Sequence, residues 1–147
     1  MHENLESPQL ISSRNSCLTA VLRMAGLRPT KQRVSLAQLL FTGSHRHTSA
    51  EMLHLEAKNS NINVSLATVY NTLNQFSQAG LVREISVDAT KSYYDTNTSD
   101  HHHFYCVEEN EVTDIPLDSI EITGLPKAPN GMIISNVDVV IRIKKVN

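Results

Sequence analysis

Three consecutive histidines at residues 101–103 are the side chains in this sequence whose type and spacing most clearly suit a chemical role. Successive side chains of a β-strand point to opposite faces, so His101 and His103 would share one face and His102 would occupy the other. Two imidazoles on one face can chelate a divalent metal, and either could be an axial haem ligand. We therefore interpret this run as a functional site rather than a polar linker.

The residues that follow the histidines predict a small sheet to hold them. Alternation and turn signals predict strands at 102–107 and 111–115, joined by a tight turn at 108–110. Residues 117–125 are expected to form a brief helix or loop, and residues 132–146 alternate as a third strand would. Such a small sheet would leave an apolar face in water, so we expect it to pair with its copy in a second subunit.

The first half of the chain predicts helices instead. Apolar spacing and stop signals indicate helices from Ser13 to Gly26 and from Thr30 to Gly43. A third helix is expected after a cap at Thr48-Ser49, where Thr48 and Glu51 have the spacing of a capping box. A hairpin at 81–95 follows a fourth helix, and this order is typical of a winged helix-turn-helix domain.

The fourth helix, expected from Ser65 to Ala79 with Gly80 as its left-handed stop, has no charged side chain. It offers short hydroxyls and amides, which hydrogen-bond to base edges and phosphates: Thr68, Asn71, Thr72, Asn74, Gln75 and Gln78. The alternative is an ordinary half-buried helix with an amide-rich surface. The hairpin after it favours a DNA-reading helix.

Charge is distributed unevenly along the 147 residues, although the net charge is only −2. Residues 7–83 carry eight Lys or Arg residues against two acids, whereas residues 84–147 carry eleven acids against five bases. A cationic first half suits a polyanion such as double-stranded DNA. We therefore predict an α+β chain with a flexible tail at 1–12, a winged-helix DNA-binding domain at 13–96, and a dimerisation and metal- or haem-sensing domain at 97–147.

Other features narrow the class of protein. No apolar run approaches the roughly 20 residues of a membrane span, and the polar N-terminus resembles no signal peptide, so we expect a cytoplasmic protein. Cys17 and Cys106 lack CxxC spacing, which argues against a disulfide framework and a structural zinc site. We assign His2, His45 and His54 to the surface, together with Arg46 and Lys58.

Five segments together resemble the ferric uptake regulator (Fur) superfamily: GLRPTKQR (26–33), HTSAEML (47–53), VSLATVYNTLNQFSQAGLV (64–82), KSYYD (91–95) and the three histidines. The branch most similar is the iron response regulator, which shares SLATVYNTLNQF, KSYYDTN and a triple histidine followed by aromatic residues. The resemblance implies a homodimeric transcription regulator, chiefly a repressor, that controls iron and haem genes according to iron or haem status.

The resemblance also implies roles for individual residues. Arg28 would approach the minor groove, and Thr30, Lys31 and Arg33 would contact phosphates; the bases or backbone would be read by Thr68, Tyr70 and Asn71, with Ser65 at the start of the same helix. His47, Asp95 and Asp114 would join His103 in a site for Zn, Fe(II) or Mn(II). Phe104 and Tyr105 replace an Asp and a His of the family motif HHHDH, which favours haem at His101, His102 and His103.

A site that spans both domains could set the angle between two DNA-reading helices through its occupancy. Two alternatives remain: a metal-dependent hydrolytic enzyme, and a metal- or haem-buffering protein on a winged-helix scaffold. The hydrolase alternative lacks an HExxH motif and does not explain the basic first half, so we predict a regulator without enzymatic activity.

Overall fold

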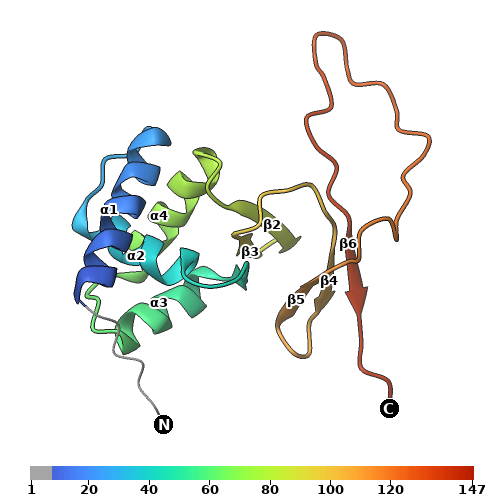
Figure 1. Ribbon diagram of the computed structural model, residues 1–147. Helices are drawn as coiled ribbons and strands as arrows, with labels where there is room; N and C mark the ends of the chain where they lie inside the picture. Colours follow the sequence, from blue (N-terminus) through green and yellow to red (C-terminus); the bar gives the residue numbers. More distant parts are fainter. Residues whose placement is uncertain (1–7) are drawn as a thin grey trace.

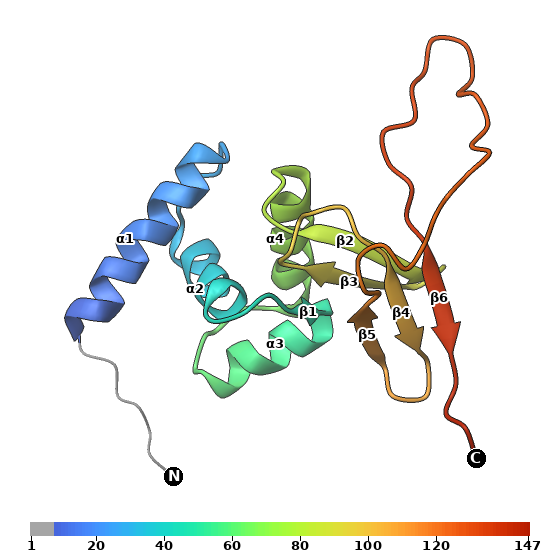
Figure 2. The same cartoon turned by 45° about the vertical axis from the view of Figure 1, so that its right-hand side comes forward.

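The computed structural model of the chain describes residues 8–147, with side chains from Asn15 onward, and contains four helices and two small sheets (Figures 1 and 2). The helices are α1 (Pro8–Met24), α2 (Lys31–Phe41), α3 (Ala50–Asn59) and α4 (Leu66–Gln78). The strands are β1 (His47–Thr48), β2 (Arg83–Asp88), β3 (Lys91–Asp95), β4 (His103–Cys106), β5 (Glu111–Asp114) and β6 (Val140–Ile143). No helix within residues 8–147 has the length and apolar character that a membrane crossing requires.

Local signals set most helix ends where the sequence predicts them. The hydroxyls of Thr30 and Ser65 accept hydrogen bonds from the first turns of α2 and α4, at 3.3 and 3.0 Å. Gly80 ends α4 with φ at +78°, a conformation that L side chains rarely adopt. The first helix is longer than predicted, since it begins at Pro8, a residue suited to the first helical turn. Part of the expected tail is therefore helical, and residues 1–7 lie outside the described part.

The start of α3 differs from the predicted capping box. Ser49, rather than Thr48, is the N-cap, and its hydroxyl accepts a hydrogen bond from the Met52 amide at 3.2 Å. Thr48 lies in β1, where its buried hydroxyl donates to the Ser49 carbonyl. Glu51 consequently does not complete a box with Thr48, and its carboxylate is hydrogen-bonded to Tyr70.

The four helices pack around one apolar cluster. It includes Leu22, Leu36, Leu40, Leu53, Val69, Leu73 and Phe76. The buried stripe of α4 runs through Val69, Leu73 and Phe76 as the spacing predicts, but two details differ. Leu66 is 36% exposed, and Thr72, expected at the surface, is buried. The remaining polar face of α4 is left in solvent.

A two-residue strand that the sequence does not predict, β1, extends the wing hairpin. The sheet order is β1-β3-β2, and the β1–β3 register places His47 opposite Asp95. Beside this pair, the Arg46 amide donates to the Thr96 hydroxyl at 2.9 Å, and the Thr96 amide donates to the Arg46 carbonyl at 3.0 Å. The guanidinium of Arg46 pairs with Glu56, so Arg46 is a structural residue and not the solvated one expected.

The second sheet has the order β5-β4-β6, with β5 antiparallel and β6 parallel to β4. Strand β6 covers only part of the predicted segment 132–146, and residues 117–125 form no helix. Residues 116–139 instead run as a long excursion away from both sheets (Figures 1 and 2). The excursion returns beside β4, where the His103 amide donates to the Val139 carbonyl at 3.1 Å.

The wing and the second sheet share a second apolar cluster. It contains Ile85, Val87, Tyr93, Tyr105 and Val112. The rings of Tyr93 and Tyr105 lie 5.9 Å apart between centroids, and the Tyr93 phenol donates to the Asn110 carbonyl at 2.9 Å. Arg83 adds a polar connection, because its guanidinium donates to the Ser99 carbonyl and pairs with Asp100 and Asp138. The helical part is therefore joined to the second sheet through the wing.

We predict that Leu73→Ala lowers the free energy of unfolding by about 2–5 kcal/mol, because Leu73 is fully buried and its truncation leaves a cavity. Leu55→Ala is the matched control, since Leu55 is 58% exposed on α3, and it should change stability by at most about 0.5 kcal/mol. Urea unfolding followed by circular dichroism measures both. Equal losses for the two variants would contradict the assignment of this core.

Candidate metal centre and nucleic-acid interface

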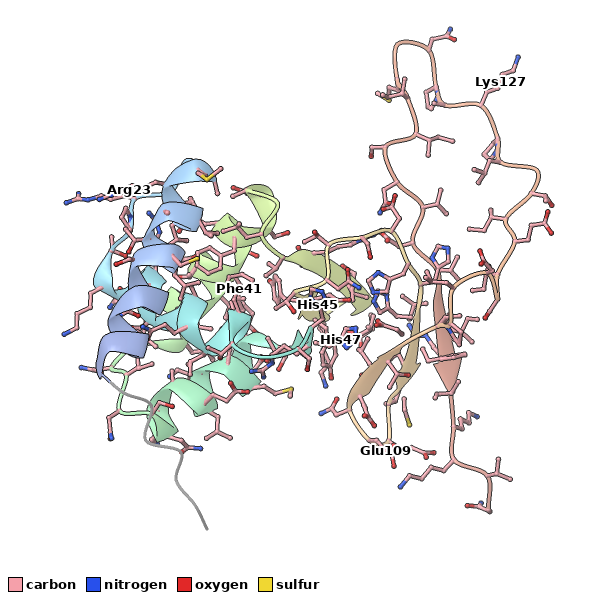
Figure 3. All side chains as sticks on the ribbon, in the orientation of Figure 1. Arg23, Phe41, His45, His47, Glu109 and Lys127 are labelled. Carbon is pink, nitrogen blue, oxygen red and sulfur yellow. The ribbon has the colours of Figure 1, made fainter. Side chains whose placement is uncertain are left out.

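Five side chains from five separate pieces of structure converge on one point. His47, Asp95, His101, His103 and Asp114 each offer one ligand atom, and these atoms all lie within 4.8 Å of one another. They come from β1, β3, the linker before β4, β4 itself and β5. Figure 3 shows His47 at the joint between the helical part and the second sheet.

Two strand pairings bring most of the cluster together. The β1–β3 ladder pairs His47 with Asp95, and the β4–β5 ladder pairs His103 with Asp114. The four residues implied by the resemblance as a metal site are thus neighbours in space. The structure adds His101 to them, a residue that the sequence analysis assigned to haem. His101 lies in the linker before β4, so the path of that linker brings it into the cluster.

The spacing within the cluster suits a single divalent cation. The Nε2 atoms of His47, His101 and His103 lie 3.0, 2.8 and 3.0 Å from Asp95 Oδ2, and 2.9, 3.0 and 3.3 Å from Asp114 Oδ1. Ligand atoms at right angles around one ion, with bonds of about 2.0–2.2 Å, lie roughly 3 Å apart. Nitrogen and carboxylate donors of this kind suit Zn, Fe(II) and Mn(II).

The tautomer of His101 supports the same conclusion. Its Nδ1 lies 2.7 Å from the Ser99 carbonyl oxygen, which can only accept, so Nδ1 carries a proton. In the neutral ring, Nε2 then presents a lone pair to the anionic oxygens of Asp95 and Asp114. That arrangement is repulsive unless a proton or a cation lies between the groups. The residues present therefore fit a divalent metal.

The pKa values of the cluster follow from its charges. Burial alone would raise the pKa of Asp95, but hydrogen bonds from His103, His47 and the Asn97 amide outweigh burial and hold that pKa far below its usual range. Burial alone would lower the pKa of His47, yet Asp95 and Asp114 together raise it. Asp95 is thus a permanent anion, and His47 retains a proton to a higher pH than an ordinary histidine.

His102 is not part of the cluster and lies immediately before β4, which begins at His103. Its Nδ1 accepts a hydrogen bond from the Val139 amide at 3.1 Å, so in the neutral ring its proton lies on Nε2. An axial haem ligand needs a free lone pair, and His102 has none directed outward. Tyr105, expected to help favour a porphyrin, is instead buried against Tyr93. Haem at His101–His103 has no support among the described residues.

The side chains assigned to DNA lie in two groups at the helical end of the molecule. On α4 and its cap, Ser65, Tyr70 and Asn71 are exposed and Thr68 is half-buried, with its hydroxyl 2.9 Å from that of Ser65. At the start of α2, the exposed residues are Arg28, Thr30 and Lys31.

Arg33 differs from the other predicted phosphate contacts because its guanidinium is used internally. It donates to Gln75 Oε1 at 2.9 Å and to the Arg28 carbonyl at 2.8 Å. Arg33 therefore fixes the Arg28 loop and the start of α2 against α4. Among the other histidines, His45 is exposed, whereas His54 is half-buried with Nε2 3.1 Å from the Val64 carbonyl, and His2 lies outside the described residues.

We predict that Mn(II) or Zn(II) affinity falls steeply as the pH decreases from about 7.5 to about 5.5, because protons compete for the histidine ligands. The raised pKa of His47 means that this competition begins above the ordinary histidine pKa of about 6.5. Isothermal titration calorimetry at several pH values measures the effect. His45→Ala should leave the profile unchanged, and an affinity independent of pH would exclude histidine ligation.

Comparison with known proteins agrees with this geometry. The model of the ferric uptake regulator family matches residues 24–142. A peroxide-responsive repressor, PerR, of Staphylococcus aureus (strain Mu50) is 35% identical over 95 residues, which are 65% of this chain and 64% of the relative. The match thus spans somewhat less than two thirds of that relative.

Two solved structures resemble the fold over most of the chain. The Vibrio cholerae ferric uptake regulator has a TM-score of 0.68 at 25% identity and covers 86% of this chain and 98% of its own. The ferric uptake regulator of Pseudomonas aeruginosa with manganese has a TM-score of 0.64 at 27% identity, covering 88% and 98%. The α+β architecture with an N-terminal winged helix is therefore confirmed, and the chain belongs to the ferric uptake regulator family.

Proposed function

We propose that this chain is a metal-responsive transcription regulator that binds operator DNA as a homodimer inside the cell and acts mainly as a repressor. The observation that carries the proposal is the position of the five-ligand cluster. Its ligands come from the wing side (His47 and Asp95) and from the second sheet and its linker (His101, His103 and Asp114). A metal ion bound by the cluster would therefore connect the wing directly to the second sheet.

The metal proposal names His47, Asp95, His101, His103 and Asp114 as ligands. A divalent cation would offset the two carboxylates and link the wing to the second sheet. Asp95 contributes a fixed negative charge, and the Ser99 carbonyl orients the His101 ring so that Nε2 points into the cluster. A cation that binds the joined arrangement better than a loosened one shifts the population toward it. Relatives of this fold include a regulator solved with manganese.

The homodimer proposal is supported by apolar surface on the second sheet and the excursion. Strand β6 has one free edge, because it pairs only with β4 in the sheet order β5-β4-β6. Large apolar side chains are exposed on β6 (Ile141 and Ile143) and on the excursion (Leu125, Met132 and Ile133). Exposed apolar side chains in such number typically mark a protein interface. A two-fold dimer would present two copies of α4 to a palindromic operator.

We propose the domain division 13–96 and 97–147, with α1 beginning earlier at Pro8. On the DNA side we propose Arg28, Thr30 and Lys31 for phosphate or minor-groove contacts, and Ser65, Thr68, Tyr70 and Asn71 for the major groove. The uncharged, exposed face of α4 favours this function over a metal buffer, which would not need it. Membership of a regulator family likewise disfavours the hydrolytic alternative.

The signal can be iron status or peroxide. The sequence segments resemble the iron response branch, whereas the Staphylococcus aureus relative is named as peroxide-responsive. Peroxide is our second candidate, supported by that relative. A haem signal is not part of the proposal, because Nε2 of His101 and of His103 is directed to carboxylates and Nδ1 of His102 accepts from the backbone.

We predict that Mn(II) raises the affinity of the protein for its operator by about 5- to 150-fold, the usual range of coupling between two sites. His103→Ala should abolish this stimulation, because it removes a ligand from the second sheet. His54→Ala is the matched control and should retain it. Fluorescence anisotropy on an operator selected from random duplexes measures the effect, and metal-independent binding by the native protein would refute the role of the cluster.

The two signals separate when the loaded metal is changed. We predict that hydrogen peroxide reduces operator binding by the Fe(II)-loaded protein but not by the Mn(II)-loaded protein if peroxide is the signal, because Fe(II) is readily oxidised by peroxide and Mn(II) is not. The same anisotropy assay measures both. Insensitivity of the Fe(II) form to peroxide, together with a response to Fe(II) concentration, would establish iron status as the signal instead.

A further inference from the structure

The outer face of α4 carries the hydroxyl group of Tyr70, whose proton is already used in a hydrogen bond within the protein. Tyr70 is 38% exposed, and its phenol donates a hydrogen bond to the carboxylate of Glu51. Glu51 is the second residue of α3, where the positive end of the helix dipole favours a negative charge. Because α3 and α4 are the two helices of the helix-turn-helix, this hydrogen bond is built into the DNA-facing part of the proposed regulator.

The proton of this pair belongs to Tyr70. The hydrogen bond with Tyr70 lowers the pKa of Glu51, and the same bond raises the pKa of Tyr70. Near neutral pH the phenol therefore keeps its proton and the carboxylate keeps its charge. A phenol has only one proton to donate. With that proton held by Glu51, the Tyr70 oxygen can only accept a hydrogen bond from a further partner.

Asn74, one helical turn further along the same face of α4, has the opposite character. Its side-chain oxygen accepts a hydrogen bond from the Tyr94 phenol at 3.0 Å. Burial raises the pKa of Tyr94 to about 12, so Tyr94 remains a donor at any physiological pH. The exposed Asn74 amide then offers two N–H donors, while its oxygen already accepts one hydrogen bond. The face thus presents an acceptor at Tyr70 and donors at Asn74.

This polarity matters because bases differ in the major groove by donors and acceptors. Adenine and cytosine present amino groups there, whereas thymine and guanine present carbonyl oxygens. A phenol that rotates freely bonds to either class and discriminates poorly between them. A phenol whose proton is held elsewhere bonds only to amino groups, and the nearby charge of Glu51 further disfavours carbonyl oxygens.

We propose that Glu51 is a specificity-determining residue: it holds the proton of Tyr70, so that the Tyr70 oxygen selects an adenine or cytosine amino group, while Asn74 donates to the adjoining part of the site. Glu51 acts through Tyr70 and is therefore a positioning residue. The inference rests on the proposed function, because it requires α4 to enter the major groove.

The test uses the full-length, Mn(II)-loaded protein and an operator that it selects from random duplexes. Affinities are then measured for every single base-pair substitution of that operator. At one position of each half-site we expect about a three- to tenfold preference for adenine or cytosine, the size expected of one hydrogen bond. Glu51→Ala and Tyr70→Phe should each reduce this preference below about twofold at the same position, and the double variant should reduce it no further.

Three further variants control the result. Glu51→Gln keeps the shape of the side chain without its charge and should also weaken the preference. Glu109→Ala removes one negative charge from the turn between β4 and β5, remote from α4 (Figure 3), and should change all affinities alike. Tyr94→Phe releases the Asn74 oxygen and should alter a neighbouring position rather than the one read by Tyr70.

The outcomes distinguish the inference from the function on which it rests. If the native protein selects no operator, the proposed function fails and the inference fails with it. If it selects one but Glu51→Ala changes only overall affinity, or alters a position different from that of Tyr70→Phe, the function stands and the inference is overturned. Loss of preference at one shared position supports both.

Discussion

Three histidine Nε2 atoms lie about 3 Å from the same two carboxylate oxygens, those of Asp95 and Asp114. The negative charge of these carboxylates must be balanced for the two parts of the structure to stay packed together. Asp95 is 1% exposed, so it has almost no water to solvate its charge. An unpaired buried carboxylate is costly, and neutral imidazoles that present lone pairs do not offset it. The balance comes from protons on the histidines or from a metal cation. The joint between the wing and the second sheet therefore contains a buried charge that needs protons or a cation beside it.

Further contacts at the joint connect the wing to that cluster. Arg83 is the ladder partner of Asp95 in the wing, and its guanidinium also holds Asp100, beside His101, and Asp138, shortly before β6. Tyr93 and Tyr105 pack across the same boundary. The cluster and the wing are thus joined by residues in direct contact. The wing in turn packs with α4, since the Tyr94 phenol from β3 donates to Asn74.

The proposed DNA-reading face and the candidate metal centre follow the same physical rule. In the candidate metal centre, the Ser99 carbonyl fixes which nitrogen of His101 carries the proton and so leaves the other nitrogen with a lone pair directed into the cluster. On α4, Glu51 fixes the proton of Tyr70 and so turns its oxygen into an acceptor. In both places a neighbouring group removes the ambiguity of a side chain that could otherwise donate or accept. The chemical role of each side chain therefore depends on a partner distant in sequence.

The sequence by itself determined the features that depend on a few adjacent residues. The caps at Thr30 and Ser65, the left-handed stop at Gly80, the apolar stripe of α4 and the wing hairpin are local, because backbone geometry and side-chain periodicity act within one or two turns. The resemblance to the family further implied that His47, Asp95, His103 and Asp114 lie close together in space.

Only the tertiary structure decided the features that depend on pairing between distant segments. Strand β1 has only two residues, which is too short to show an alternating pattern. It could therefore not be predicted from the sequence, although it places His47 opposite Asp95. The entry of His101 into the cluster depends on the path of the linker, and the partner of Glu51 depends on how α3 packs against α4, which overrode the local capping pattern. The reason is the same in each case: hydrogen bonds and charges are satisfied by whichever group the fold brings near, and sequence spacing does not measure that distance.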